Sequence, residues 1–547
     1  MQRNQSTKIS KITMRKILFD CEIKTITSLI EIASQEYSDQ IFVSVLGEQG
    51  TIDTTYKALY NEAVDIAHEI IQKFGLHGNI AIVGRLSKWW IVRYFAILLS
   101  GNTVVPIAGD NSLALIDALH FSNCVACFLE DSLANKIDLQ RECACAIINT
   151  KPSKMQAGIG VFPLPNISPH DIAMIVFTSG TAGKPKAVCL SHFSIMRDVQ
   201  YSAEIMGKST FEVGDSIVPV LPPFHMFEIT TGLLTPICYG AKIGISNTEI
   251  NLRKAISVFA PSALVMVPLI AANIQKQILS SSQTFRCLCR VNSLLPKNFF
   301  LKKRLGRIIQ KNLGGKLKVI VCGGAAIDKT ISDWFNSVGI SFLTGYGITE
   351  CSPVVSCNSK NAFRAGSVGK PLTDYCTVEI IDGEIVITGD ILFSGYYNES
   401  HPYNKSKDCF FTGDIGYFDD DGFLYVTGRK KDVLVGDNGV NIMPAELENL
   451  LLKHDIIEEA LVCFEHKHRQ TCLAAYVYLS KEYTKALSDA DITCCLETIR
   501  DTINQKTSRD FYISIIRQIP KGFEKNLLGK VKRYVYVDQN GFWKNTC

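Results

Sequence analysis

A short polar segment near residue 180 carries the side chains with the clearest chemical potential. It follows the apolar run Met174–Phe177, which has the composition of a buried strand. The segment holds hydroxyl groups on Thr178, Ser179 and Thr181, glycines at Gly180 and Gly183, and ammonium groups on Lys184 and Lys186. Hydroxyls, ammonium groups and backbone N–H groups freed by glycine together suit a polyphosphate. A solvated surface turn has the same composition, so this segment alone leaves both interpretations open.

The segment differs from the common phosphate-binding loop of kinases and ATPases. That loop needs Gly-Lys followed by Ser or Thr, whereas Lys184 is followed by Pro185. A phosphate-loop kinase is therefore disfavoured. Such a kinase would release ADP from ATP, which gives a direct way to distinguish it.

Further motifs follow in order along the chain: Gly345–Glu350 (GYGITE), Thr412–Asp414 (TGD), Gly428–Asp432 (GRKKD) and Asn526–Lys530 (NLLGK). With Thr178–Lys186 (TSGTAGKPK) they resemble the signature of the adenylate-forming superfamily, which includes acyl-CoA synthetases, luciferases and peptide-synthetase adenylation domains. The resemblance spans about residues 170–533 and, more loosely, Ile26–Leu133. Within the superfamily, Gly345–Asn358 (GYGITECSPVVSCN) is most similar to bacterial fatty-acid ligases of the acyl-acyl-carrier-protein synthetase (Aas-like) type.

The resemblance implies a ligase that works in two steps. A carboxylate attacks the α-phosphorus of ATP, pyrophosphate leaves, and the acyl-adenylate then passes its acyl group to a phosphopantetheine thiol. Two anions meet in the first step, so catalysis is expected to rest on positioning and charge neutralisation. The cofactors implied are ATP and Mg²⁺. A protein that keeps the fold without turnover, a degenerate adenylate-binding protein, is the non-enzyme alternative.

The same resemblance assigns roles to residues of this chain. Phosphate binding falls to Thr178, Ser179, Gly180, Thr181, Gly183 and Lys186, with departures from the usual pattern at Ala182 and Ala187. The other nucleotide contacts are Gly323, Gly324, Ala325 and Tyr346 at the adenine, Asp414 and Arg429 at the ribose, and Thr349 at the α-phosphate. Glu350 is the expected magnesium ligand. Without the resemblance, Thr349 is a helix cap and Asp414 an ordinary turn residue.

Two lysines are expected to have central roles in the catalytic cycle. Lys530 is expected to bridge the substrate carboxylate and the α-phosphate during adenylation only. Lys431 is the expected hinge about which a C-terminal domain swings, so that Gly436–Ile442 replaces Lys530 and admits the thiol. A solvated basic turn at Lys530 and an ordinary surface loop at Lys431 are the alternatives.

The acid and the acceptor rest on weaker signals. Leu221–Glu228 (LPPFHMFE) resembles a pocket entrance with His225 as a gate, next to Met226 and Gly232. No aspartate is placed there to hold an amino group, so a long-chain fatty acid is favoured. Acyl-carrier protein is the favoured acceptor and CoA the alternative. A basic face would suit the acidic carrier protein; its candidates are Lys302, Lys303, Arg304, Arg307, Lys530, Lys532 and Arg533.

The layout predicts an α/β protein. Short β-branched runs alternate with helical segments such as Tyr56–Phe74 from about residue 20 to 345, which favours parallel sheets flanked by helices. The strands expected there are Ile80–Val83, Val125–Phe128, Met174–Phe177, Ile217–Val220, Ala263–Val267 and Leu317–Cys322. We expect a basic flexible extension at 1–20, an AMP-binding domain at 21–430 with a small β-subdomain at about 366–428, and a mobile α+β domain at 431–547.

Composition narrows the setting. The formal charge of +4 over 547 residues and the lack of a long basic run argue against nucleic acid. The 19 cysteines lie scattered in apolar segments, including the pair Cys124 and Cys127, which favours core packing over metal and a reducing, cytoplasmic setting. The apolar stretch Trp89–Ala108 is interrupted by Arg93, Gly101 and Pro106, so it predicts a helix and a strand, not a membrane span. Peripheral membrane association stays open.

Overall fold

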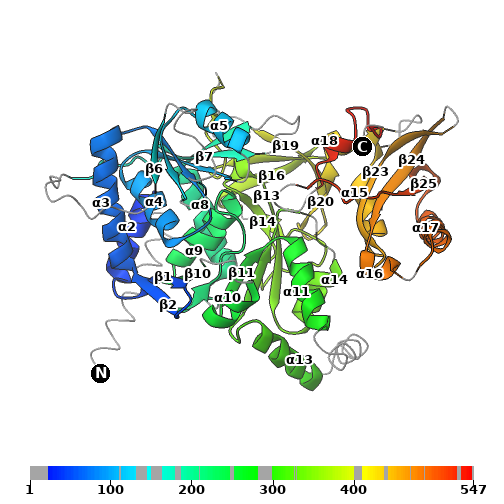
Figure 1. Cartoon of the computed structure of the whole chain (residues 1–547), viewed down its shortest axis with the longest axis horizontal. Helices are drawn as coiled ribbons and strands as arrows, with labels where there is room; N and C mark the ends of the chain where they lie inside the picture. The colour runs from blue at the N-terminus through cyan, green and yellow to red at the C-terminus, as the bar shows by residue number, and fades with distance from the viewer. Residues whose placement is uncertain are drawn as a thin grey trace. The chain divides into compact units, whose positions relative to one another are not determined.

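The computed structural model describes residues 23–109, 112–130, 133, 145–149, 163–178, 186–207, 210–246, 252–280, 299–325, 327, 329–371, 373–399, 409–435, 441–467, 470–485, 487–525 and 531–544. The chain forms two compact units (Figure 1). The large unit comprises the chain up to Thr377 together with Ile387–Phe410. The small unit comprises Val378–Val386 together with the chain from Phe411 onwards. The extension expected at 1–20 lies outside the described residues.

A seven-stranded sheet holds one half of the large unit. Its strands, in spatial order, are β18 (Gly395–Tyr396), β8 (Lys186–Ser191), β7 (Ile172–Thr178), β4 (Thr103–Ile107), β3 (Asn79–Val83), β5 (Cys124–Leu129) and β6 (Ala146–Asn149). The strands from β7 to β6 are parallel, whereas β8 and β18 add an antiparallel edge. Cys124 and Cys127 are buried in the core on this sheet, so the packing interpretation of this pair is confirmed.

A nine-stranded sheet holds the other half. Its order is β15 (Lys370–Pro371), β14 (Val354–Cys357), β13 (Ser341–Gly347), β12 (Val319–Cys322), β11 (Ala263–Met266), β9 (Ser216–Ile217), β10 (Lys242–Ser246), β1 (Ile41–Leu46) and β2 (Thr51–Thr55). The six strands from β13 to β1 are parallel and the outer pairs antiparallel. The predicted α/β class with parallel-rich sheets is confirmed.

Helices cover both sheets of the large unit. They are α2 (Ile26–Glu36), α3 (Tyr56–Phe74), α4 (Lys88–Leu99), α5 (Ser112–Phe121), α8 (His192–Met206), α9 (Thr235–Ile237), α10 (Leu252–Phe259), α11 (Pro268–Ser280), α13 (Phe299–Asn312) and α14 (Lys329–Ser337), with the π-helix η1 (Glu228–Leu234) and the 3₁₀ turn η2 (Thr349–Cys351). Helices α2, α3 and α4 pack together, as the blue part of Figure 1 shows. Helix α8 contacts β8 of one sheet and β14 of the other, so it lies between the two layers.

Local sequence explains two of these elements directly. Helix α3 has the predicted bounds because the Thr55 side chain accepts the N–H of Ala58 at its start and Gly75 ends it with φ of 77°. The apolar stretch Trp89–Ala108 divides into α4 and β4, as predicted. Among the described residues, no helix combines the length and the apolarity that crossing a membrane requires.

The small unit contains three sheets. They are the four-stranded β16 (Cys376–Ile381), β17 (Glu384–Gly389), β19 (Phe410–Phe418) and β20 (Leu424–Arg429), which reaches into both units; the pair β21 (Leu434–Val435) and β22 (Asn441–Ile442); and β23 (Ile457–Lys467), β24 (Gln470–Leu479) and β25 (Ile513–Gln518). Its helical segments are α15 (Pro444–Leu451), α16 (Lys481–Thr484), α17 (Asp489–Asn504) and α18 (Arg533–Tyr536), with 3₁₀ turns η3 (Lys430–Asp432) and η4 (Arg509–Phe511). Helices α15 and α17 share one apolar core with β23–β25.

Two buried carboxyl groups shape the interior of the large unit. Asp198 on α8 accepts the backbone N–H of Val354 at 2.7 Å, which joins α8 to the start of β14. Glu228 opens η1 and accepts the backbone N–H of Leu221 at 2.9 Å. Strand β9 ends at Ile217 and not at the predicted Val220, whose backbone hydrogen-bonds to the Glu228 carboxyl group. Burial raises the pKa of Asp198 well above its usual value and that of Glu228 to about 8.

The raised pKa of Glu228 predicts that its protonated form stabilises the large unit. Because the folded pKa of about 8 lies above the unfolded value, this contribution is complete at acid pH and is lost as the pH rises toward 8. The loss is at most about 1.4 kcal/mol per pH unit. Glu228→Gln should therefore match the wild type near pH 5 and become more stable relative to it at pH 8, in urea unfolding experiments.

The exposed carboxylate of Glu212 in the same unit provides the matched control. Glu212→Gln should leave the pH dependence of unfolding unchanged. Equal pH dependence in wild type and Glu228→Gln would contradict the buried-acid interpretation.

Candidate active site

A tight turn between β13 and β14 presents Thr349 and Glu350. A Cβ on Gly347 would lie 2.0 Å from the carbonyl oxygen of Pro353, so only glycine fits there. The N–H of Ile348 donates to that same oxygen at 2.9 Å and closes the turn. The N-cap residue of η2 is Ile348, and Thr349 already lies inside this 3₁₀ turn. The interpretation of Thr349 as a helix cap is therefore wrong. The motif Gly345–Glu350 is thus a strand end followed by a rigid turn.

Glu350 is held by groups from a distant segment. The hydroxyl of Tyr396 donates to Oε1 of Glu350 at 3.0 Å, and the N–H of Phe393 donates to the Glu350 carbonyl at 2.9 Å. The Lys186 ammonium lies 4.2 Å from the centre of the Tyr396 ring. The structure therefore brings together two predicted site residues, Lys186 and Glu350, around a third that the sequence did not single out.

The donor set around Glu350 fits magnesium. Mg²⁺ usually takes one or two carboxylates from the protein and completes its shell with water and phosphate oxygens. Glu350 is half-buried, and one of its oxygens accepts a hydrogen bond from the Tyr396 phenol. Within the described ranges no group of three or more His, Cys, Asp or Glu side chains is arranged around a common point. A single-carboxylate site suits magnesium bound together with a nucleotide.

The predicted phosphate segment connects two antiparallel strands. Thr178 ends β7 and Lys186 begins β8, where the two residues are direct partners and the Thr178 hydroxyl donates to the Lys186 carbonyl at 3.4 Å. Ser179, Gly180, Thr181 and Gly183 lie outside the described residues. The phosphate loop of kinases joins a strand to a helix. A strand follows here, which agrees with the exclusion of that class from the sequence.

The glycine-containing segment Gly323–Ala325, which follows β12, lies beside the strand β13 that leads into the Glu350 turn. A Cβ on Gly323 would be 3.4 Å from the Gly345 carbonyl oxygen and 3.5 Å from the Phe227 ring. Gly323, Gly324 and Ala325 thus stand at the carboxyl end of a parallel strand, where open α/β sheets bind ligands. Gly345 itself lies inside β13, at the point where its partner changes from β12 to β14. Tyr346 follows and is half-buried.

The predicted pocket entrance is buried. Met226 is 3% exposed, and burial lowers the pKa of His225 to about 4, so its imidazole is neutral at physiological pH. In the part of the chain that the structure describes, Nε2 of His225 has no hydrogen-bond partner, unlike an ordinary satisfied core histidine. A Cβ on Gly232 would lie 2.5 Å from Oε1 of Glu228. The packing of Glu228 therefore already explains glycine at position 232.

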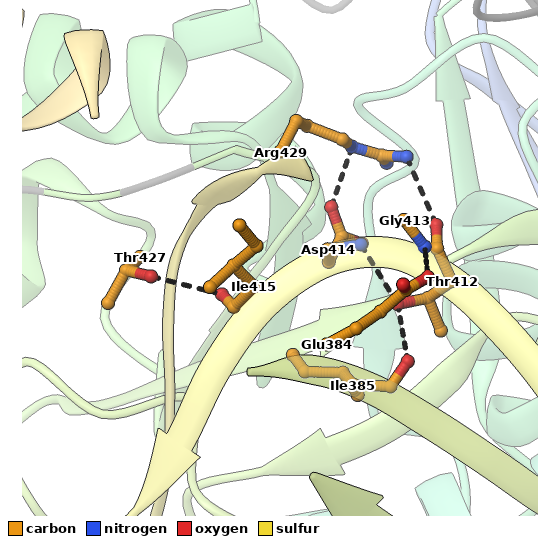
Figure 2. Close-up of polar contacts among 8 residues, drawn as sticks. All are labelled: Glu384, Ile385, Thr412, Gly413, Asp414, Ile415, Thr427 and Arg429. Carbon is orange, nitrogen blue, oxygen red and sulfur yellow. Dashed lines mark hydrogen bonds and ion pairs between the residues drawn. The ribbon is translucent and has the colours of Figure 1, made fainter. Parts of the chain in front are cut away.

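In the small unit, Asp414 and Arg429 form one ion pair (Figure 2). They are direct partners in β19 and β20, with Oδ1 of Asp414 2.6 Å from Nε of Arg429. The Asp414 side chain is 5% exposed and that of Arg429 33% exposed. Thr412 accepts the N–H of Asp414 and donates to the carbonyl of Ile385, which anchors the aspartate in the sheet. The sequence named both residues but did not reveal that they act as a pair.

The segment of the expected hinge forms the 3₁₀ turn η3 and is partly tied down. The ammonium of Lys430 lies 2.7 Å from Oε2 of Glu384. The Lys431 residue as a whole is exposed, but its ammonium group is partly desolvated by neighbouring atoms, which lowers its pKa. The predicted thiol-admitting residues 436–440 lie outside the described residues; Val435 of β21 and Asn441 of β22 flank them and pair directly.

Lys530 lies outside the described residues, but both of its flanks are firmly held. On its two sides, Lys525 and Val531 form an antiparallel bridge. Arg533 donates to Glu448 and to the carbonyl of Val462. Lys532 pairs with Glu524. Two cations of the expected basic face are thus already paired within this unit, which weakens the argument for a carrier-protein surface.

Comparison with known proteins identifies the family. A model of AMP-binding enzymes matches residues 30–397. The chain is 29% identical over 421 residues to the long-chain-fatty-acid–CoA ligase FadD15 of Mycobacterium bovis, covering 69% of each chain. It is 28% identical over 526 residues to a long-chain-fatty-acid–CoA ligase of Bacillus subtilis, covering 84% of this chain and 86% of the relative.

Solved structures of related fold agree. O-succinylbenzoate coenzyme A synthetase (MenE) from Bacillus subtilis, in complex with ATP and magnesium, superposes with a TM-score of 0.71 at 20% identity, covering 92% of this chain and 98% of that one. Together with the turn that carries Glu350, the strand ends at Thr178 and Lys186 and the Asp414–Arg429 pair, these matches place the chain in the AMP-binding enzyme family, as an ATP- and Mg²⁺-dependent, AMP-forming ligase that joins an acid to a thiol through an acyl-adenylate.

Proposed function

We propose that this chain is a long-chain fatty-acid–CoA ligase. The observation that carries the proposal is the similarity over 84% of the chain to a Bacillus subtilis long-chain-fatty-acid–CoA ligase. The buried Met226 and the half-buried His225 suit a hydrocarbon chain. The relatives named as CoA ligases move the preferred acceptor from acyl-carrier protein, which the motif Gly345–Asn358 favoured, to CoA. We retain a cytoplasmic setting as part of the proposal.

The residues divide the adenylation step as follows. Lys186 and the segment before it hold the β- and γ-phosphates, and Glu350 holds magnesium against them. Thr349 contacts the α-phosphate, and Tyr346 and Gly323–Ala325 line the adenine. Asp414 accepts hydrogen bonds from the ribose hydroxyls while Arg429 keeps its charge balanced. The carboxylate oxygen then forms a bond to the α-phosphorus as the bond to the leaving pyrophosphate breaks.

Lys530 supplies the cation that lets the two anions approach. The described residues on its two sides are held by the Lys525–Val531 bridge and by the bond from Arg533 to Glu448, which supports a role that needs a fixed base. In the second step the thiol of CoA attacks the acyl carbonyl carbon and AMP leaves. We propose that rotation about Lys431 exchanges Lys530 for the segment 436–442, and that the C-terminal domain begins there.

The acceptor is tested by offering both thiols. With palmitate, ATP and Mg²⁺, we expect AMP and pyrophosphate to form, with a larger kcat/KM for CoA than for holo-acyl-carrier protein. A larger value with the carrier protein would restore that acceptor. Failure to cleave ATP with any fatty acid would indicate a degenerate adenylate-binding protein, and release of ADP would exclude the family mechanism.

Replacing Lys530 should separate the two steps. Lys530→Ala is expected to slow palmitate-dependent ATP–pyrophosphate exchange by roughly 10²–10³-fold, because a preorganised charge-stabilising group is lost. Thioester formation from synthetic palmitoyl-adenylate should be nearly unchanged. Lys532→Ala, which removes the same charge two residues further along the chain, should retain exchange. Near-normal exchange in Lys530→Ala would refute the assignment.

A proline at position 431 tests the hinge. Lys431→Pro restricts backbone rotation and should stop thioester formation while leaving ATP–pyrophosphate exchange intact. Lys431→Ala removes the charge but keeps the rotation, so it should support both steps. If Lys431→Pro loses the two steps equally, the hinge lies elsewhere.

A further inference from the structure

Tyr396 lies between two charged residues that come from distant parts of the large unit. The ammonium of Lys186, at the start of β8, stands 4.2 Å from the centre of its ring. The carboxylate of Glu350, in η2, accepts a 3.0 Å hydrogen bond from its hydroxyl. One side chain therefore contacts a cation through its π face and an anion through its polar end.

Backbone pairing fixes Tyr396 in place. Tyr396 pairs with Val188 across β18 and β8, and the bonds from Ser394 N to Cys189 O and from Tyr397 N to Ala187 O, both 2.8 Å, continue the pairing on each side. The ring of Phe393 meets the Tyr396 ring edge to face, with centroids 4.9 Å apart. The backbone of Tyr396 is therefore hydrogen-bonded to β8, the strand that begins with Lys186. The Tyr396 ring packs against the ring of Phe393.

The Tyr396 hydroxyl is the donor and the Glu350 carboxylate the acceptor of this hydrogen bond. A hydrogen bond to a charged acceptor is stronger than one between neutral groups, so it orients Glu350 effectively.

Lys186 and Glu350 carry opposite charges but do not pair with each other. Among the residues that the structure describes, neither of them forms an ion pair with a charged partner. A direct contact would occupy the carboxylate and the ammonium that the nucleotide and its metal require. Instead, the ammonium contacts the Tyr396 ring and the carboxylate contacts the Tyr396 hydroxyl, and a cation–π contact gives the ammonium a weaker, replaceable partner.

We propose that Tyr396 is a positioning residue that keeps Lys186 and Glu350 apart and aimed, so that the ammonium is available to ATP phosphates and the carboxylate to Mg²⁺. This inference rests on the proposed roles of those two residues. It assigns separate tasks to the two parts of the side chain: the hydroxyl orients the metal-binding carboxylate, and the ring holds the ammonium. A residue that only filled space at this position would need the aromatic ring and not the hydroxyl.

Two substitutions separate these tasks. Tyr396→Phe keeps the ring and removes the hydroxyl, whereas Tyr396→Leu removes both. Binding of ATP without fatty acid, measured by calorimetry with Mg²⁺ and again with EDTA, reports the two groups without turnover. Tyr396→Phe should weaken binding about tenfold with Mg²⁺, the effect of one hydrogen bond to a charged group, and leave binding in EDTA nearly unchanged. Tyr396→Leu should weaken both, by roughly threefold or more in EDTA.

Tyr397→Phe is the matched control. The Tyr397 hydroxyl accepts from Asn79 at 3.1 Å rather than contacting Lys186 or Glu350, so this variant should bind as the wild type does. Thermal unfolding establishes that each variant is folded. In a ligand-free crystal structure of Tyr396→Leu, the Lys186 ammonium should lie within about 4 Å of the Glu350 carboxylate, as an ion pair.

The outcomes distinguish this inference from the proposed function. If Tyr396→Phe binds ATP with Mg²⁺ as tightly as the wild type, the hydroxyl does not position the metal ligand and the inference is wrong. If Tyr396→Leu is folded and leaves Lys186 and Glu350 apart, the spacer role is wrong. If the wild type itself binds no ATP with Mg²⁺, the proposed function fails instead.

Discussion

The turn that admits no side chain at Gly347 constrains the whole site of the large unit. The Pro353 oxygen occupies the space of the missing Cβ and accepts the N–H of Ile348, so the backbone from β13 to β14 has one course. Neighbouring elements grip both sides of this turn: Asp198 of α8 accepts the N–H of Val354, and Phe393 donates to the carbonyl of Glu350. Because this rigid turn carries Glu350, the Glu350 carboxylate is positioned before any ligand binds. Electrostatic catalysis requires such preorganisation.

The two units handle charge differently. In the small unit, Asp414 and Arg429 neutralise each other at 2.6 Å, so a ribose hydroxyl approaching Asp414 meets a carboxylate that is already oriented and compensated. In the large unit, Tyr396 contacts Lys186 through its ring and Glu350 through its hydroxyl, and we propose that it keeps the two apart. Pairing stabilises a contact that is kept, whereas separation leaves both groups ready for new partners. The difference matches the proposed tasks of ribose binding and of phosphate and metal binding.

Several parts of the fold and the site follow from the sequence. Helix α3 was predicted with its observed bounds, because a Thr N-cap and a Gly stop frame a clear apolar period. Strand β7 was predicted at Met174–Phe177, because a polar, glycine-containing segment follows an apolar run, and the structure extends it to Ile172–Thr178. Strand β9 is shorter than predicted, because the backbone of Val220, its predicted last residue, hydrogen-bonds to the carboxyl group of Glu228. Local patterns do not report such distant bonds.

Tyr396 shows the same limit from the side of function. Its neighbours in sequence, Gly395 and Tyr397, carry no recognisable motif, and its importance arises only when β18 pairs with β8. The partnership of Asp414 and Arg429 likewise depends on the register of β19 and β20. Residue types and spacing identified most of the groups that could react, but strand pairing determines which of them meet.

The position of β18 at the edge of the seven-stranded sheet also has a consequence for biosynthesis. Gly395 and Tyr396 leave the ribosome long after Cys189 and Val188, their partners in β8. Until then the outer edge of β8 has no strand beside it, and an open edge can pair with other chains and aggregate. The nascent protein therefore has to shield this edge from the synthesis of β8 until that of β18, so translation products truncated between them are expected to be poorly soluble.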